Sequence, residues 1–448
     1  MEPADLDGLY ALHVAELERR YARVLAEQGW DAVAIHSGAP VKRSAFDDQL
    51  WPLRPVPHWQ HWTSLSEPDC ALVVRPGRRP RLARLTGAGG FWEKQGPPDT
   101  EAFLEVFDVT AIADPAGARQ HLGGGRVAFV GEDRARAGSW GLDGARVCPP
   151  ALLAALDGLR ATKTPYEVAC VAEANRRARG GHEALRDAFG AGDASELDLH
   201  LRYLQATAQD DWETPYKNIV ALGANAATLH HVAYGRVAAR RAAESLLVDA
   251  GATCRGYCAD VTRTWSKGTG AAADAFAQLL AGVEAMQRRL CAAVRVGMPY
   301  EELHDESHRQ VGALLRDVGV LRGGVEEAVA AGVTRAFYPH GLGHSLGLQT
   351  HDVGCALRRP REENPFLRNT TDVAVGQVFT IEPGVYFIEA LLGPLRAGEH
   401  AGLVSWGAVD ALAPLGGVRI EDDLYVCGGE GVVRNLTREQ LLVGGAVV

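Results

Sequence analysis

The chain has 448 residues, of which 47% are hydrophobic and 23% are charged, and its net charge is −10. This length exceeds one ordinary hydrophobic core and predicts two globular domains. The negative charge, without a large basic cluster, argues against nucleic acid as the main partner. The first residues lack the pattern of a signal peptide, and no stretch approaches the about 20 apolar residues of a membrane span. The eight cysteines are scattered and do not indicate a disulfide framework, so we expect a reduced, cytoplasmic setting and no membrane partner.

The first part of the chain has the pattern of an α/β domain, which we place over residues 1–158. Apolar residues at helical spacing predict a helix over residues 9–28, which Gly29 ends. Strands are expected at Asp31–His36, Cys70–Arg75, Arg81–Thr86 and Arg126–Val130. The stretch Phe46–Trp62 is rich in Pro, Trp and His without a clean period, so a long ordered loop is expected there.

The second domain is predicted over residues 159–448. It begins with a strong helix signal, because Thr164 is a good N-cap, Pro165 suits the first helical position and Glu167 follows the cap by three residues. That helix is expected to end near Phe189. Further helices are expected near 195–208, 272–296 and 300–318, and strands near 218–222, 378–381 and 417–420. Helices combined with antiparallel hairpins indicate the α+β class.

The stretch Val248–Trp265 contains the first candidate site. Strand formers flank a turn signal at Arg255-Gly256, which predicts a β-hairpin. A turn centred between Cys254 and Arg255 would pair Asp249 directly with Asp260, with their Cβ atoms about 5 Å apart. Two bare carboxylates at that distance repel each other, and one or two divalent cations would remove the repulsion. The alternative is a pair of surface aspartates beside a turn.

A second candidate segment packs three histidines among glycines. His340, His344 and His351 fall within 12 residues, and imidazole is the commonest metal ligand in proteins. The glycines at 341, 343 and 347 would let the backbone approach a ligand closely. A single histidine would more often be structural, but this cluster favours a site.

Two carboxylates follow predicted strands further along the chain. Glu382 ends an apolar strand before Pro-Gly, where a carboxylate must be paired or bound to a metal. Arg419 and Glu421 are two residues apart on a predicted strand and therefore share a face, although a surface salt bridge is the alternative. The chemistry of the segment from Pro215 to His230 is not legible from the residues alone.

Taken together, the motifs resemble the prolidase branch of the creatinase/aminopeptidase/prolidase group, the pita-bread metallopeptidases. The motifs are Asp-Ala-Gly…Ala-Asp-Val-Thr-Arg-Thr-Trp, Pro-His-Gly-Leu-Gly-His…Gly-Leu-Gln-Thr-His-Asp-Val-Gly, Thr-Ile-Glu-Pro-Gly-Val-Tyr-Phe-Ile-Glu and Gly-Gly-Val-Arg-Ile-Glu-Asp. The likeness covers nearly the whole chain, including Ile35-His36-Ser37-Gly38 and the Phe46-Asp47-Asp48 loop. It is close to bacterial Xaa-Pro dipeptidases and to organophosphorus acid anhydrolases. It implies a pita-bread catalytic domain preceded by a smaller α/β domain.

The resemblance also implies a centre of two divalent metal ions. Its ligands would be Asp249, Asp260, His344, Glu382 and Glu421, all present here, with Asp260 and Glu421 bridging the ions. Four carboxylates and one imidazole suit Mn²⁺, with Zn²⁺, Co²⁺ and Fe²⁺ as alternatives. Because metal-free and binding-only members of the fold lose these ligands, the resemblance implies an enzyme.

The implied reaction is hydrolysis of dipeptides with a C-terminal proline by a hydroxide that bridges the two ions. Glu382 would relay the proton to the leaving nitrogen, and His340 or His351 would stabilise the oxyanion. Arg419, helped by His351, would bind the free carboxylate of the substrate. The remaining residues that the resemblance assigns to the substrate pocket are Tyr216, His230 and, from the partner subunit of a homodimer, Asp47 or Asp48.

Two other activities stay open. Aminopeptidase P uses the same ligands on longer peptides and differs by lacking a capped pocket, and organophosphate hydrolysis would be a side activity of the same centre. Two departures from the expected pattern lie near the rim of the pocket. Gly223-Ala224-Asn225 stands where an Asn-Glu turn is expected, and His231 stands where a Tyr is expected.

Overall fold

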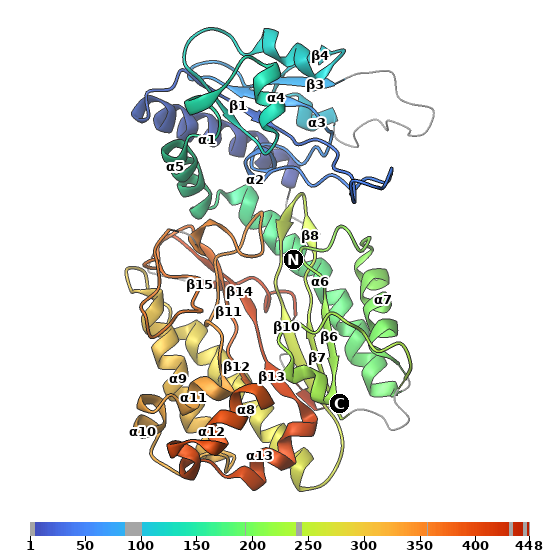
Figure 1. The fold of residues 1–448 in the computed structure, drawn as a ribbon, viewed down its shortest axis with the longest axis vertical. Helices are drawn as coiled ribbons and strands as arrows, with labels where there is room; N and C mark the ends of the chain where they lie inside the picture. The colour runs from blue at the N-terminus through green and yellow to red at the C-terminus, as the bar shows by residue number, and fades with distance from the viewer. Residues whose placement is uncertain are drawn as a thin grey trace. The chain divides into compact units, whose positions relative to one another are not determined.

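The computed structural model describes residues 5–85, 101–192, 194–238, 244–355, 357–429, 433–441 and 446–447. The chain divides into two compact units, Met1–Cys170 and Val171–Val448 (Figure 1). Both units contain parts of the long helix α6 (Pro165–Ala191), which starts at the predicted Thr164 signal. Domain bounds at residues 158 and 159 stay a prediction.

The first unit is built on a five-stranded mixed sheet with the order β4-β3-β2-β1-β5. Its strands are β1 (Ala32–His36), β2 (Ala71–Val74), β3 (Arg81–Leu85), β4 (Asp108–Ile112) and β5 (Val127–Val130). Its α-helices are α1 (Leu6–Glu27), α2 (Pro57–Gln60), α3 (Glu101–Leu104), α4 (Arg134–Ser139) and α5 (Pro150–Ala161), with 3₁₀ turns at Pro115–His121 and Gly144–Arg146. The predicted first helix and four strands are confirmed; Thr86, the expected end of β3, lies outside the described residues. The sequence does not signal β4, because that strand is largely exposed and lacks an apolar run.

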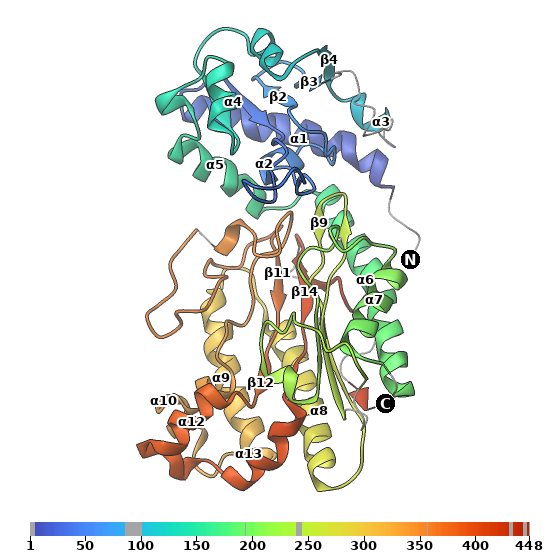
Figure 2. The same ribbon diagram turned by 45° about the vertical axis from the view of Figure 1, so that its right-hand side comes forward.

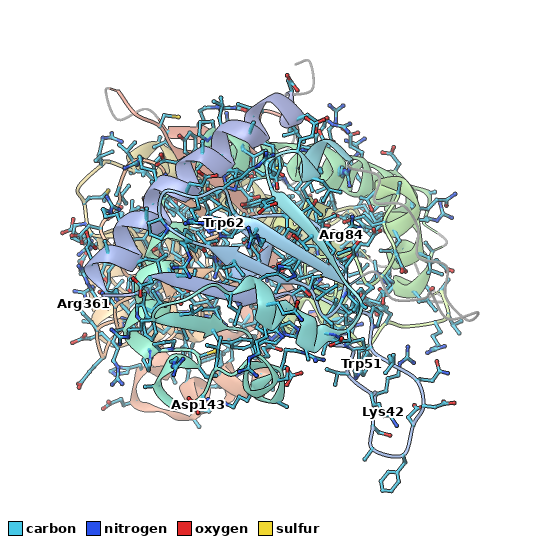
Figure 3. The ribbon with its side chains drawn as sticks, turned by 90° about the horizontal axis from the view of Figure 1, so that it is seen from above. Lys42, Trp51, Trp62, Arg84, Asp143 and Arg361 are labelled. Atoms are coloured by element: carbon cyan, nitrogen blue, oxygen red, sulfur yellow. The ribbon has the colours of Figure 1, made fainter. Side chains whose placement is uncertain are left out.

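The predicted long loop of the first unit, Phe46–Trp62, is only partly a loop. It contains helix α2, and Trp59 and Trp62 are buried in the core. The preceding segment, which carries Lys42 and Trp51, extends away from the sheet of this unit (Figure 3). Phe46 is fully exposed on it, and the Asp47 carboxylate accepts a hydrogen bond from the backbone of Gln49 at 2.8 Å.

The second unit contains two main sheets with helices on their outer sides (Figures 1 and 2). One sheet has the order β16-β10-β7-β6, and the other has the order β11-β14-β15. The strands of this unit are β6 (Ile219–Leu222), β7 (Ser245–Asp249), β8 (Thr253–Cys254), β9 (Tyr257–Cys258), β10 (Thr262–Ser266), β11 (Val378–Ile381), β12 (Gly384–Tyr386), β13 (Gly417–Arg419), β14 (Asp422–Val426), β15 (Val433–Asn435) and β16 (Ala446–Val447).

The helices of the second unit form two groups. The first group, α6 and α7 (Glu196–Thr207), packs Leu185 and Tyr203 against Val248 of β7 and Trp265 of β10. The second group packs on β11 to β14 and comprises α8 (Ala271–Ala293), α9 (Tyr300–Asp317), α10 (Val325–Ala330), α11 (Val333–Phe337), α12 (Glu389–Ala397) and α13 (Trp406–Leu412). Short 3₁₀ turns lie at Gly223–Ala227, Val353–Cys355, Glu399–Leu403 and Ala413–Leu415. This mixture of helices and mainly antiparallel strands confirms the α+β class.

The register of the predicted hairpin differs from the expected one. Asp249 of β7 lies opposite Thr262 of β10, so the prediction that it directly faces Asp260 is wrong. The reason is the turn: Arg255 and Gly256 both have positive φ, 51° and 89°, as in a type I′ turn, so the turn centre lies between them. Moving the centre by one residue moves every partner by two, which preserves the face of the ribbon. The two aspartates are therefore diagonal neighbours on one face.

Candidate active site

A pocket of about 990 Å³ opens in the second unit, and its lining includes Asp249 of β7, Glu382 directly after β11 and Arg419 of β13. Nine of the predicted site residues line it: His230, Asp249, Asp260, His340, His344, His351, Glu382, Arg419 and Glu421. Tyr216 is not one of the lining residues, but its hydroxyl donates a hydrogen bond to Oδ1 of Asp260. Asp47 and Asp48 belong to the first unit.

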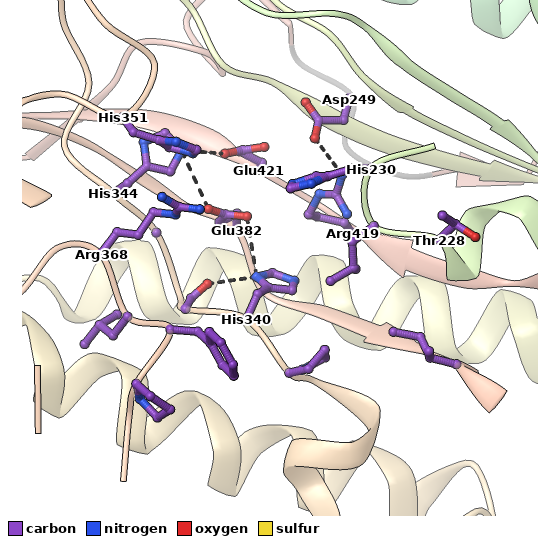
Figure 4. Close-up of a pocket in the computed structure, with 18 of the residues that line it drawn as sticks. Thr228, His230, Asp249, His340, His344, His351, Arg368, Glu382, Arg419 and Glu421 are labelled. Atoms are coloured by element: carbon purple, nitrogen blue, oxygen red, sulfur yellow. Dashed lines mark hydrogen bonds and ion pairs between the residues drawn. The ribbon is translucent and has the colours of Figure 1, made fainter. Parts of the chain in front are cut away.

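Three of the predicted metal ligands form a tight buried cluster. One ligand atom from each of Asp260, His344 and Glu421 lies within 4.8 Å of the other two. Nε2 of His344 is 3.3 Å from Oδ2 of Asp260 and 3.8 Å from Oε1 of Glu421. Glu382 joins the cluster, with Oε1 at 3.7 Å from the same His344 nitrogen (Figure 4).

The fifth predicted ligand, Asp249, is held by Arg419. Nη2 of Arg419 donates to Oδ2 of Asp249 at 2.6 Å, and Nη1 donates to the Tyr386 hydroxyl at 2.9 Å. Nε of Arg419 donates to Oγ1 of Thr262 at 3.1 Å. Oδ1 of Asp249 is buried and has no hydrogen-bond partner within the described part of the chain. One carboxylate oxygen of Asp249 is thus oriented by arginine, and the other is left for a ligand.

Close backbone contacts bring these segments together. A Cβ at Gly251 would lie 2.0 Å from the carbonyl oxygen of Ala259, so only glycine allows the two arms of the hairpin to approach at the aspartates. A Cβ at Gly343 would lie 2.1 Å from the carbonyl oxygen of Thr380, so this glycine lets His344 pack on β11. The tight approach at Gly343 is therefore to a neighbouring strand, whereas the sequence suggested approach to a ligand.

The histidine and carboxylates of the cluster shift each other's pKa values. Burial raises the pKa of Glu382 to about 7 and also raises the pKa values of Asp249 and Glu421. Burial opposes ionisation of Asp260 too, but the hydrogen bond and charge of His344 outweigh it and lower the pKa of Asp260. In return, although burial disfavours the charged imidazole, Asp260 and Glu382 raise the pKa of His344 to about 9.

This donor set fits a divalent cation. Four carboxylates share a buried space with one imidazole, which is costly unless positive charge compensates them. The unpartnered oxygen of Asp249 points to the same need. Oxygen-rich coordination with one imidazole suits Mn²⁺ and related ions. The residues that could hold ions are Asp249, Asp260, His344, Glu382 and Glu421.

Two further histidines stand beside the ligands. Nδ1 of His340 lies 2.9 Å from the carbonyl oxygen of Gly341 and 3.6 Å from Oε2 of Glu382, and its Nε2 lies 2.7 Å from the Tyr386 hydroxyl. Burial and the charge of Arg419 lower the pKa of His340 to about 3. His351 meets His344 edge-on at 4.6 Å between ring centroids, and burial with His344 lowers its pKa to about 4. Both imidazoles are therefore neutral near pH 7 and present one N–H donor each.

Two residues that the sequence did not single out belong to this site. Tyr386 links His340 to Arg419 through its hydroxyl and is fully buried. Arg368 is an exposed arginine that points into the pocket, toward Glu382 (Figure 4). No carboxylate lies within 4.0 Å of its guanidinium in the described ranges. Neither residue had a local signal, because a tyrosine in an apolar strand and an arginine in a loop are both common.

Comparison with known proteins identifies the family. The model for "Metallopeptidase family M24" matches residues 169–427, and the model for "Xaa-Pro dipeptidase, N-terminal domain" matches residues 8–157. The chain belongs to metallopeptidase family M24. Its curated relatives include an Xaa-Pro dipeptidase of Marinobacter nauticus, 41% identical over 98% of this chain and 100% of the relative. Another, from Aeromonas hydrophila, is 39% identical over 96% of this chain and 98% of the relative.

Solved structures of two aminopeptidases share the fold. Zinc-substituted aminopeptidase P of Escherichia coli, in complex with product, aligns with a TM-score of 0.72 and 23% identity over 95% of each chain. Proline aminopeptidase P II of Yersinia pestis aligns with a TM-score of 0.72 and 22% identity over 96% of this chain and 97% of that one. The predicted family and the predicted pita-bread fold, with its preceding N-terminal domain, are confirmed.

Proposed function

We propose that this metallopeptidase is an Xaa-Pro dipeptidase that hydrolyses dipeptides with a C-terminal proline. The observation that carries the proposal is the convergence of five metal-ligand side chains on one pocket: Asp249, Asp260, His344, Glu382 and Glu421. The full-length likeness to curated relatives that bear this name supports the substrate class. The pocket with its candidate ligands and the likeness to dipeptidases together favour a dipeptide over a protein as the substrate.

The cofactor that we propose is a pair of divalent cations, with Mn²⁺ as the first candidate and Zn²⁺ or Co²⁺ as alternatives. Such ions polarise a carbonyl and lower the pKa of bound water. Asp260, Glu421 and Glu382 would hold the ions together with His344, because each of these carboxylates approaches the same His344 nitrogen. Asp249 would add the oxygen that Arg419 leaves without a partner.

The protein side chains would move and hold protons around the scissile bond. Glu382 is the proposed general base and acid, since its carboxylate faces both His344 and His340. Of the two predicted donors to the developing oxyanion, the contacts favour His351, which is a neutral imidazole at the pocket wall. Both ring nitrogens of His340 are already engaged, by the Gly341 carbonyl and the Tyr386 hydroxyl. Tyr386 would fix the ring of His340 through the hydrogen bond at Nε2.

The free carboxylate of the substrate needs a cation, and the contacts favour Arg368 for this role over the predicted Arg419. Arg419 already donates to Asp249, Thr262 and Tyr386 and is only 4% exposed. Arg368 is exposed at the pocket, where it can offer a bidentate guanidinium. His351 and His230 remain proposed substrate contacts, and Arg419 becomes the residue that orients Asp249.

Several finer expectations belong to the same proposal. A homodimer in which Asp47 or Asp48 of the partner limits substrate length stays a prediction of the family likeness, as does Tyr216 as a substrate contact. Seven cysteines whose side chains the structure describes carry thiols, which supports the expected reducing, cytoplasmic setting. Among the described residues, we find no helix with the length and apolarity that crossing a membrane requires.

The proposal is tested by dialysis against a chelator and return of Mn²⁺, Co²⁺ or Zn²⁺, with three substrates assayed side by side. The substrates are an Xaa-Pro dipeptide, an Xaa-Pro-Yaa-Yaa tetrapeptide and a phosphotriester. We expect metal-dependent cleavage of the dipeptide and little cleavage of the tetrapeptide. Faster cleavage of the tetrapeptide would favour the aminopeptidase P alternative, and equal rates with and without metal would refute the proposed centre.

A further inference from the structure

One wall of the pocket is a loop between β6 and the next strand, residues 223–235. Its residues Ala227, Thr228, Leu229 and His230 line the pocket. Most of the loop is exposed, and Ala226 is its one fully buried residue. The His230 side chain is itself exposed, so its place at the pocket depends on how the loop backbone is held.

A single buried carboxylate outside the pocket anchors this loop at both ends. Glu196 is 2% exposed and is the first residue of α7. Its Oε1 accepts from the backbone N of Leu222 at 2.9 Å and from Nδ2 of Asn225 at 2.8 Å. Its Oε2 accepts from Nε2 of His231 at 2.8 Å and from the backbone N of Gly235 at 2.7 Å.

These four hydrogen bonds use the full accepting capacity of a carboxylate. They also offset its burial, since the donors together lower the pKa of Glu196 although desolvation opposes this. Glu196 is not needed to cap α7, because Ser195 and Asp198 already form a reciprocal capping box there. The side chain is thus committed to the loop and not to its own helix.

The other anchors of the loop are weaker or lie at its far end. Ala226 packs against Ile219, Leu247 and Tyr386, and the Tyr234 hydroxyl donates to the carbonyl of Asn218. His231, next to His230 in sequence, is the residue through which Glu196 reaches the middle of the loop.

We propose that Glu196 is a positioning residue of the active site, which holds His230 and Thr228 at the pocket wall through His231 and Asn225. This positioning role rests on the proposed function only where it is tested by the KM and kcat for a dipeptide substrate. His230 contacts substrate in that proposal, so a loosened loop should weaken binding of the dipeptide while the metal ligands, which lie on other segments, keep their places. The expected signature is a higher KM with a nearly unchanged kcat.

Three substitutions test the proposal in the metal-loaded full-length enzyme. Glu196→Gln replaces one accepting oxygen, and the two hydrogen bonds that it accepts, with an NH₂ group. His231→Leu removes one donor, and His231→Gln keeps an N–H close to the position of Nε2. We expect Glu196→Gln and His231→Leu to raise KM for an Xaa-Pro dipeptide about tenfold or more, and His231→Gln to stay within about threefold of wild type. Glu173→Gln, which alters a carboxylate on α6 that pairs with Arg176, is the matched control and should leave KM unchanged.

Hydrogen exchange of the backbone gives a second readout that needs no activity. At least one of the amides of Leu222 and Gly235, which donate to different oxygens of Glu196, should lose protection in Glu196→Gln, and both should keep it in the control. If wild type cleaves no Xaa-Pro dipeptide, the proposed function fails, while exchange still reports on the anchor. Unchanged exchange in Glu196→Gln would overturn the anchor, and faster exchange with an unchanged KM would overturn the positioning role. If Glu196→Gln does not fold, the two His231 variants test the proposal instead. Equal KM values for His231→Leu and His231→Gln would contradict it.

Discussion

Nη2 of Arg419 lies 2.6 Å from Oδ2 of Asp249, and this ion pair is largely buried at the wall of the pocket. The pair fixes one oxygen of Asp249 and leaves the other without a partner among the described residues. Arg419 therefore acts on the metal site through its aspartate. This relationship also explains why the arginine that the motif suggests for the substrate is already engaged by the protein.

Replacing Arg419 by methionine should destabilise the metal-free protein more than the metal-loaded one. The variant leaves a buried carboxylate without its cation, which typically costs about 3–5 kcal/mol, whereas bound divalent ions would compensate that charge. Thermal unfolding with and without Mn²⁺ measures the difference. Arg434→Met is the control, because Arg434 pairs with Glu439 at 2.7 Å near the surface and such pairs contribute about 1 kcal/mol or less. An equal loss of stability in Arg419→Met and Arg434→Met would contradict the buried ion pair between Arg419 and Asp249.

Arg368→Ala should mainly weaken binding of dipeptides with a free prolyl carboxylate. Loss of a charge-assisted contact corresponds to about 1.5–3 kcal/mol, so we expect KM to rise about 10- to 100-fold with kcat less affected. Arg358→Ala changes an exposed arginine ten positions earlier, paired with Asp372 at 3.2 Å, and should leave KM unchanged. If Arg358→Ala and Arg368→Ala have the same KM, a residue other than Arg368 binds the carboxylate of the substrate.

Gly251→Ala should damage the hairpin that carries both aspartates. The new Cβ would meet the carbonyl oxygen of Ala259 at 2.0 Å, so the arms of the hairpin must move apart. Overpacking of this kind costs roughly 1–3 kcal/mol, and displaced aspartates should also lower metal affinity. Gly407→Ala is the comparison, because nothing lies within 4 Å of a Cβ there and the residue sits in helix α13. Melting temperature and calorimetric Mn²⁺ binding report the two effects, and identical values for both variants would be evidence against the close contact.

His304→Leu should reduce the loss of stability in acid. Burial, aided by Arg335, lowers the pKa of His304 to about 4 in the folded protein, below the ordinary value of 6.5. The stability that the neutral imidazole contributes is therefore complete above about pH 6.5 and is lost as the pH falls toward about 4. Between pH 7 and pH 5 this corresponds to about 2 kcal/mol.

Thermal unfolding at pH 7 and pH 5 measures this effect. The drop in melting temperature should be smaller in His304→Leu than in wild type. His400→Leu, at a side chain with 41% exposure, should not change the drop. An equal acid-induced drop in wild type and His304→Leu would show that His304 contributes nothing to it.

Much of the site could be predicted because its residues are marked by local patterns. Asp249 ends the apolar strand β7, Glu382 directly follows β11 and Glu421 lies between β13 and β14. Three histidines stand among glycines, so each segment signals chemistry by itself. The main helices and strands were also predictable, since their apolar spacing is regular. The edge strand β4 was not, because exposure removes that spacing.

What the sequence by itself determined is therefore the set of metal-ligand candidates and the elements that carry them. The tertiary structure decided how they are used: the register that sets Thr262 opposite Asp249, the commitment of Arg419 to Asp249, and the anchoring of the pocket loop by Glu196. The physical reason is distance along the chain. Arg419 and Asp249 are 170 residues apart, and Glu196 and His231 are 35 apart. No local propensity encodes a hydrogen bond that forms only once separate elements have packed together.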